Sequence, residues 1–215
     1  KTRMAELTVS KRKKERILEV SEELFAEFGY DRTSVRMIAQ KANINIAMIS
    51  YYFGSKELLF TELVEYRALS FRLRLQDIQK EIEDPMKQIE MMIDGYVDKV
   101  FVNHRFHKIL HRQISLQNSS ELNVQIQSIL MKNINEVKNI IESGIKKKVF
   151  RQVDVEFLII TFFGTVSQFS NSSGLSLSLL NLDQGMHLTQ IPEMKSRMKK
   201  YLTELFAKYL LITNN

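Results

Sequence analysis

Cysteine is absent from the 215-residue sequence, which excludes disulfide bonds and thiolate metal sites. Proline is almost absent too, because only Pro85 and Pro192 occur, and glycine occurs seven times. A chain with so few helix-breaking residues can run in long helices. No stretch alternates apolar and polar residues for long enough to predict a sheet. These absences predict an all-α fold.

Long apolar runs are also missing. The longest, residues 155–166, contains Glu156 and falls short of the roughly 20 residues that span a bilayer. The basic N-terminus is not followed by an apolar segment, so we expect no signal peptide. Together with the lack of cysteine, this predicts a cytoplasmic protein without a membrane partner.

Motifs of common enzyme sites do not occur. The sequence has no glycine-rich phosphate loop, no thiol nucleophile and no paired carboxylates facing a histidine at metal-ligand spacing. We therefore expect neither an enzyme nor a cofactor. His104, His107 and His111 fall on one helix face and are spaced for a metal. Their arginine and lysine neighbours oppose a cation, so the preferred interpretation is a basic patch and no metal site.

Positive charge is concentrated near the N-terminus. The net charge is +6, and residues 1–16 hold seven lysines or arginines against two glutamates, or +5. A basic arm, residues 1–11, ahead of a helical region suits a polyanion such as DNA. A solubilising tail explains the same charge equally well.

Apolar periodicity predicts four helices in the first 82 residues. They cover residues 11–28, a short segment capped by Thr33 or Ser34, residues 45–53, and residues 55 to about 82. Gly29 is placed to end the first helix, and Asn45 and Ser55 to cap the third and fourth. The expected buried face of the first helix is Ile17, Val20, Leu24, Phe25 and Phe28.

The remaining two-thirds of the chain continues in helical patterns. After a helix start at Asp84 and Pro85, they cover residues 86–102, 104–117, 120–148 and 154–172, with a last helix from Pro192. Residues 173–191, rich in serine, leucine, asparagine and glycine, predict a long loop. We expect a DNA-binding domain at residues 1–54 and a second domain at residues 55–215.

The second and third helices are joined by a very short connection at Asn43 and Ile44. Such a connection is typical of a helix-turn-helix. The motif needs a small residue at the helix crossing, which Ala39 supplies, and a turn residue that tolerates positive φ, which Asn43 supplies. Ile49 and Phe53 are placed to face inward, which leaves the rest of the third helix to face outward.

The outward residues of the third helix are the predicted DNA contacts. A recognition helix places its first residues against base edges in the major groove, where apolar side chains can contact thymine methyl groups. Tyrosines and Lys56 can donate to phosphates, and Thr33 with the start of the second helix can hold another. The alternative is that Ile46 and Met48 are buried against another helix. The predicted DNA-binding residues are Thr33, Arg36, Asn45, Ile46, Ala47, Met48, Ser50, Tyr51, Tyr52 and Lys56.

The stretch RILEVSEELFAEFGYDRTSVRMIAQKANINIAMISYYFGSKELL resembles the N-terminal DNA-binding domain of the TetR family of bacterial transcriptional regulators. Its landmarks are LFAEFGYDRTSV, IAQKANI, YYF and SKELL. The resemblance implies three DNA-binding helices, a linking fourth helix, and a C-terminal domain for ligand binding and dimerisation. Asn43 replaces the usual glycine, and Ile46, Ala47 and Ser50 replace residues common in the family's recognition helix. These departures bear on the operator sequence.

Two features of the C-terminal half support a homodimer. Residues 155–169 are apolar nearly all round, and the last helix has one wide apolar stripe. Paired with their symmetry mates, the two helices would form a four-helix interface. The alternative is a monomer that buries the first of these helices internally.

Methionine and aromatic residues of the C-terminal half predict a pocket for a largely apolar small-molecule effector. Each of them could equally be ordinary core. The predicted ligand-binding residues are Met92, Tyr96, Phe106, His107, Phe162 and Phe163.

The predicted function is sequence-specific transcriptional regulation, as a repressor released from a palindromic operator by its effector. The alternative is a helical protein-interaction module that does not bind DNA. Steep loss of affinity with salt would distinguish DNA binding from this alternative.

Overall fold

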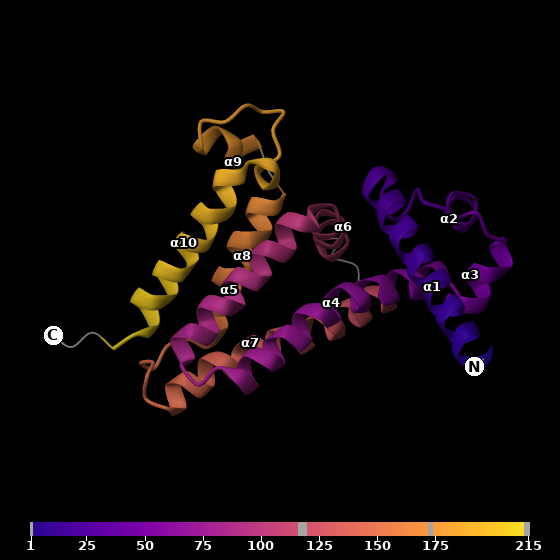
Figure 1. Ribbon diagram of the computed structural model, residues 1–215. Coiled ribbons are helices and arrows are strands. Elements are labelled where there is room, and N and C mark those ends of the chain that lie inside the picture. Colours follow the sequence, from indigo (N-terminus) through magenta and orange to yellow (C-terminus); the bar gives the residue numbers. More distant parts are fainter. Residues whose placement is uncertain (1, 116–119, 172–173, 213–215) are drawn as a thin grey trace. The chain divides into compact units, whose positions relative to one another are not determined.

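The computed structural model describes residues 2–115, 120–171 and 174–212, with the backbone alone for residues 2–9. Within these ranges the regular structure is helical, apart from one isolated β-bridge between Phe150 and Leu211 (Figure 1). The all-α prediction is confirmed. The helices are α1 (Thr2–Phe28), α2 (Val35–Ala42), α3 (Ile46–Phe53), α4 (Lys56–Glu81), α5 (Pro85–Val102), α6 (His104–Ser115), α7 (Glu121–Lys146), α8 (Val155–Ser170), α9 (Gly174–Leu179), the 3-10 helix η1 (Leu188–Gln190) and α10 (Pro192–Leu210).

The chain forms two compact units. The N-terminal unit comprises Lys1–Arg67 and Lys108–Ile129, and the C-terminal unit comprises Ala68–His107 and Leu130–Asn215. Helices α4, α6 and α7 therefore each continue from one unit into the other. The domain boundary expected between residues 54 and 55 lies between α3 and α4, and it stays a prediction.

The N-terminal unit has a core of aromatic and aliphatic side chains. The ring of Phe25 meets that of Phe60 edge-on at 5.3 Å between centroids, and Tyr30 lies 5.1 Å from Phe60. The inward face predicted for α1 is confirmed except for Phe28, which is 41% exposed. Phe28 is the last residue of α1, and Gly29, with a φ of +84°, turns the chain away from the helix axis.

Helix ends follow the local signals in the sequence. The amide of Gly29 donates to the carbonyl of Phe25 at 2.9 Å, which closes α1. The side chain of Asn45 accepts from the amide of Ala47 at 2.9 Å, and Ser55 caps α4 in the same way. Asp84 caps α5, with Pro85 as its first residue, so the starts predicted at Asn45, Ser55 and Asp84 are confirmed.

The C-terminal unit has one core formed by α5, α7, α8, α10 and the end of α4. Figure 1 shows α5, α8 and α10 side by side. Phe162 and Phe206 are fully buried between them, with ring centroids 5.8 Å apart. Although α8 is strongly apolar, no helix of the described residues is long and apolar enough to span a lipid bilayer.

Two expectations about irregular segments are wrong. The first helix does not begin near Lys11, because α1 begins at Thr2 and no glycine or proline interrupts residues 2–28. The role of residues 1–11 as a basic arm that meets DNA stays a prediction. Residues 174–191 are not one long loop, because they contain α9 and η1, in which Leu177 and Leu188 are buried. The alternation of leucine and serine in α9 hides its helical character. The expected helix ends at residues 117 and 172, and the loop start at 173, lie outside the described residues.

The close approach of α7 to the following turn gives a stability prediction. A β-carbon on Gly144 would lie 2.2 Å from the ring of Phe150, which is 2% exposed and cannot move aside. We expect Gly144→Ala to lower the free energy of unfolding by about 1–3 kcal/mol, the usual effect of overpacking a core. Thermal denaturation followed by circular dichroism measures the change.

The matched control is Gly95→Ala in the interior of α5, where an added β-carbon meets no atom within 4 Å. For Gly95→Ala we expect the free energy of unfolding to rise by about 0.5–1 kcal/mol, because alanine has a higher helix propensity than glycine. Equal melting temperatures for Gly144→Ala and the unchanged protein would contradict the packing described for Phe150.

Candidate nucleic-acid interface

The turn between α2 and α3 has the geometry of a helix-turn-helix. Asn43 lies in the left-handed region, at φ 53° and ψ 50°, as predicted. Its amide donates to the carbonyl of Gln40, and the amide of Ile44 donates to the carbonyl of Ala39 at 3.0 Å. Asparagine tolerates this conformation better than most residues, so glycine is not required at this position.

Helix α3 has a buried face and an exposed face. Ile49 and Phe53 are 1% and 5% exposed, whereas Ile46 is 47% and Tyr51 is 83% exposed. Ala47 and Ser50 are also exposed, and Met48 and Tyr52 are half-buried. The alternative in which Ile46 is buried against another helix is therefore wrong for this chain.

Thr33 does not present its side chain to a ligand. It is 1% exposed, and its hydroxyl donates to the carbonyls of Gly29 at 2.8 Å and Leu24 at 3.2 Å. Ser34, not Thr33, caps α2 by accepting from the amide of Met37. The proposed phosphate contact by the Thr33 hydroxyl is therefore corrected: that hydroxyl stabilises the turn after α1.

Lys56 is held by the same turn. Its ammonium group donates to the carbonyls of Tyr30 at 3.1 Å and Thr33 at 3.2 Å, and it lies 4.3 Å from the centre of the Tyr30 ring. Burial raises the pKa of the Tyr30 phenol, and the Glu57 carboxylate raises it further, so the ring stays neutral. The side chain of Lys56 thus connects the start of α4 to the α1–α2 turn.

Among the other predicted DNA contacts, Arg36 and Asn45 are exposed and Tyr52 is half-buried. Arg36 lies on the exposed side of α2, and Asn45 is exposed at the start of α3, although its carbonyl oxygen is used to cap that helix. The hydroxyl of Tyr52 lies 3.5 Å from that of Ser10 on α1, and its ring meets Tyr51 at 5.1 Å. The exposed residues of α3 are therefore Ile46, Ala47, Ser50 and Tyr51.

Five of the six predicted ligand-binding residues meet in the C-terminal unit. The ring of Tyr96 lies 5.0 Å from Phe163, 5.3 Å from Phe162 and 5.9 Å from His107. The ring of Phe106 lies 5.6 Å from His107. The sixth, Met92, is fully buried in the same core. Burial raises the pKa of Tyr96, so its phenol is neutral inside this aromatic cluster.

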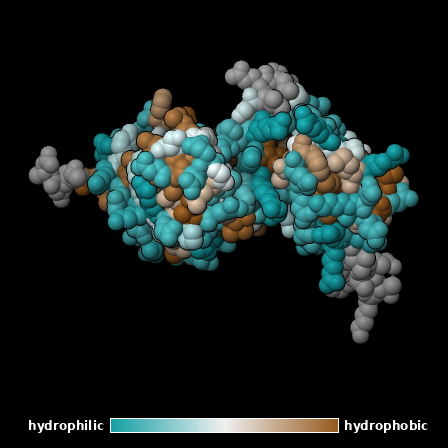
Figure 2. All heavy atoms as spheres, turned by 90° about the horizontal axis from the view of Figure 1, so that it is seen from above, coloured by the Kyte–Doolittle hydropathy of each residue, from teal (hydrophilic) through white to brown (hydrophobic). Residues whose placement is uncertain are grey.

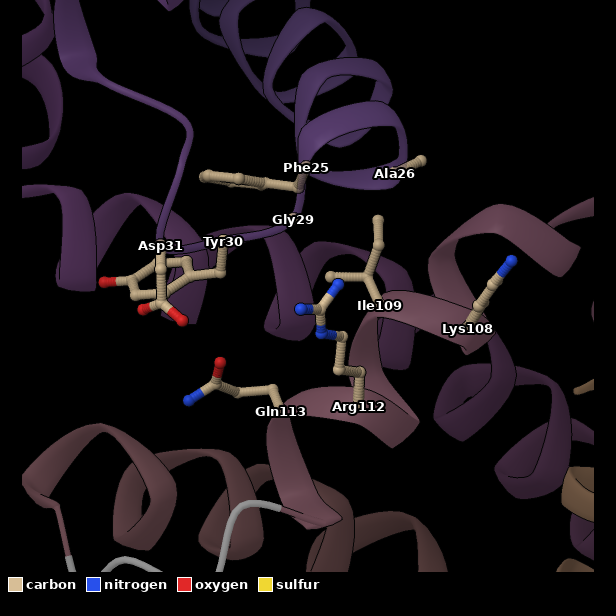
Figure 3. A pocket seen from close by; sticks show the side chains of 9 residues that line it. All are labelled: Phe25, Ala26, Gly29, Tyr30, Asp31, Lys108, Ile109, Arg112 and Gln113. Atoms are coloured by element: carbon tan, nitrogen blue, oxygen red, sulfur yellow. The ribbon is translucent and has the colours of Figure 1, made fainter.

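A pocket that the sequence did not predict lies in the N-terminal unit (Figure 3). The guanidinium of Arg112 points toward Gly29, where an added β-carbon would lie 3.2 Å from Nη1. The end of α1 carries partial negative charge on its free carbonyls, which favours this cation. The volume of about 50 Å³ admits a few water molecules and no organic effector. The lining residues are Phe25, Ala26, Gly29, Tyr30, Asp31, Lys108, Ile109, Arg112 and Gln113.

Comparison with known proteins agrees with this geometry. Residues 17–63 match the sequence profile described as "Bacterial regulatory proteins, tetR family". The HTH-type transcriptional repressor NicS of Pseudomonas putida is 28% identical over 145 residues, 65% of this chain and 66% of that protein.

Two solved structures share the fold over most of the chain. The fatty acid degradation regulator FadR of Bacillus halodurans has a TM-score of 0.70 at 20% identity, and covers 88% of this chain and 97% of its own. The transcriptional regulator FadR of Bacillus subtilis in complex with stearoyl-CoA has a TM-score of 0.68 at 22% identity, with 87% and 96% covered.

The turn at Asn43, the divided faces of α3 and the matched profile define a helix-turn-helix DNA-binding protein. Residues 17–63 are therefore similar to the DNA-binding domain of the TetR family, and the relative NicS is a transcriptional repressor.

The different roles of Lys56 and Tyr51 can be separated by stability measurements. Lys56→Ala removes two charge-assisted hydrogen bonds, so we expect the free energy of unfolding to fall by about 1.5–3 kcal/mol. Tyr51→Ala truncates an exposed ring, so we expect a change within about 0.5 kcal/mol. Urea denaturation of both variants measures the difference, and equal losses would contradict the two assignments.

Proposed function

We propose that this regulator is a repressor that binds a palindromic operator as a homodimer and is released by a small-molecule effector. The single observation that supports DNA recognition most strongly is the exposure of Ile46 and Tyr51 on α3 while Ile49 and Phe53 fill the core. A helix held in this way can enter the major groove with its first turns. Because it acts on DNA, we expect the protein to work in the cytoplasm.

The proposed contacts divide into two sets. Ile46, Ala47, Met48 and Ser50 would lie against base edges. Phosphates would be contacted from the surrounding positions, which carry charged, hydroxyl or amide groups. These positions are Arg36, Asn45, Tyr51, Tyr52 and, through its charge, Lys56.

The C-terminal unit presents the surface that a dimer needs. On α8, Phe157 and Ile160 are 69% and 63% exposed, three residues apart on one face. On α10, Tyr201 is 54% exposed. Figure 2 shows brown apolar side chains on the surface of this unit, at the left of the view. A second copy of the chain would cover α8 and α10 through a two-fold interface. The same interface would set the distance between the two recognition helices α3 of the dimer.

The aromatic cluster around Tyr96 is the proposed effector site. Its members come from α4, α5, α6 and α8, and it is apolar with a few polar groups, as small-molecule sites are. Because the structural neighbour FadR of Bacillus subtilis binds stearoyl-CoA, we propose a long-chain acyl compound as the effector class. Its apolar chain would displace rings of this cluster.

Helix α6 provides the route from this cluster to the DNA-binding helices. Phe106 and His107 belong to the cluster, and five residues further along the same helix Arg112 contacts the end of α1. An effector that prefers a displaced α6 would loosen the Arg112 contact and disfavour the DNA-binding conformation. The effector relieves repression only to the extent that it binds the conformation with displaced α6 more tightly than the DNA-binding conformation.

Selection of bound fragments from random double-stranded DNA tests the proposed function. We expect an inverted repeat whose half-sites are about one helical turn, or a multiple of it, apart. Binding should weaken steeply as salt rises, because phosphate contacts release counterions.

Two variants serve as controls for the selection. Tyr51→Ala should bind the recovered operator more weakly without loss of stability. Ile160→Lys, which adds a charge to the proposed interface, should recover single half-sites. Failure to enrich any sequence would contradict DNA recognition, and a direct repeat would contradict the two-fold dimer.

The effector proposal predicts that stearoyl-CoA lowers operator affinity by about 5- to 150-fold, the usual range of allosteric coupling. The ratio of operator Kd with and without stearoyl-CoA should shrink in Arg112→Gln, because the contact with Gly29 is lost. Arg105→Gln, exposed on the same helix, is the control and should keep the ratio. An unchanged operator Kd in saturating stearoyl-CoA would contradict this effector class.

A further inference from the structure

The recognition helix has an unusual composition. Its eight residues, IAMISYYF, include no lysine, arginine, aspartate, glutamate, asparagine or glutamine. The side chains that most often read bases are therefore missing from it: arginine or lysine bridges the guanine edge, and asparagine or glutamine bridges the adenine edge. Hydrogen-bond readout from α3 is limited to hydroxyl groups.

Neither the flanking residues Asn45 and Lys56 nor Tyr52 of α3 itself supply the missing groups. The side-chain oxygen of Asn45 accepts from the amide of Ala47 at 2.9 Å, so it is turned back to the helix and away from a paired contact with adenine. The hydroxyl of Tyr52 lies beside Ser10 on α1. The ammonium group of Lys56 is held by the carbonyls of Tyr30 and Thr33.

What α3 does present is apolar. Ile46 is 47% exposed in its first turn, Ala47 beside it is exposed, and Met48 is half-exposed. In the major groove only one base carries an apolar group at its edge, and that group is the C5 methyl of thymine. Burying a methyl group against an aliphatic side chain is favourable, whereas placing it against the polar edge of a G·C pair leaves base groups without partners.

From this composition and exposure we infer that α3 reads thymine methyl groups, so that the operator half-sites carry A·T pairs opposite Ile46 and Ala47. The inference rests on the proposed function and names the sequence class that the same surface selects. Charge complementarity supports DNA as the occupant of this apolar face, because exposed Arg36 on α2 and Arg12, Lys13 and Arg16 on α1 lie on the same unit. Those cations contact phosphates and carry no sequence information.

Replacing thymine with deoxyuridine removes the methyl group and leaves base pairing intact. In the operator recovered by selection, each thymine of the half-sites is replaced in symmetric pairs, and the Kd is measured by fluorescence anisotropy at fixed salt. At the positions opposite Ile46 we expect affinity to fall about four-fold per methyl group, or about fifteen-fold per symmetric pair, the value of one buried methylene each. In a second operator the T·A pairs at those positions are replaced by C·G pairs, which should weaken binding. Replacing the cytosines with 5-methylcytosine should then restore part of the lost affinity.

A double-mutant cycle between protein and DNA assigns the effect to one side chain. In Ile46→Ala the penalty for deoxyuridine at the facing positions should shrink toward one-fold, because the partner of the methyl group is gone. The matched control is Ile114→Ala on α6, an isoleucine of the same unit that is 39% exposed. This control should keep the full penalty.

Three outcomes overturn the inference. Half-sites without thymine, or deoxyuridine substitution that changes no Kd, would show that α3 does not read methyl groups, with DNA binding by an inverted repeat still intact. An equal deoxyuridine penalty in Ile46→Ala and Ile114→Ala would remove Ile46 as the reader. Recovery of no DNA sequence at all would overturn the proposed function itself, which distinguishes the two failures.

Discussion

The burial of Ile49 and Phe53 is the interaction on which the rest of the recognition surface depends. A helix of eight residues is too short to be stable alone, so α3 exists because its inner face completes the core of the N-terminal unit. Asn43, in the left-handed region, sets the direction in which α3 leaves α2. With Ile49 and Phe53 turned inward, the helical period turns Tyr51 outward. Ile46 lies seven residues before Phe53, on the same side of the helix, and its place in the first turn leaves it 47% exposed.

Three polar side chains of the N-terminal unit stabilise or contact the turn that follows α1. Thr33 and Lys56 both use their donors on carbonyls of the turn after α1. Arg112 uses its charge against the end of the same helix, beside Gly29. The turn at residues 29–33 is thus stabilised by Thr33 and Lys56 and contacted by Arg112. Through Lys56 and Arg112, α4 and α6 contact the segment that precedes α2.

The sequence allowed most helices and their ends to be predicted, because caps such as Asn45, Ser55 and Asp84 act over two or three residues. Exposure of Tyr51 follows from the helical period, but that of Ile46 does not, because Ile46 lies seven residues before Phe53 on the same side of the helix. The inward hydroxyl of Thr33 and the Arg112 pocket could not be predicted, since each depends on partners brought close by tertiary packing. Helix α9 was missed because leucine alternates with serine there, a pattern with the period of a strand.

The central claim is that the outer face of α3 enters the major groove, and site-specific cross-linking tests it most directly. The chain contains no cysteine, so Tyr51→Cys introduces a unique thiol at a position of α3 where the native side chain is 83% exposed. Operator DNA would carry a disulfide-activated tether on C5 of one pyrimidine, which projects into the major groove. The account predicts efficient cross-linking of Tyr51→Cys at defined half-site positions and none for Ile114→Cys. Equal yields for the two variants, or no cross-link from Tyr51→Cys at any position, would contradict it.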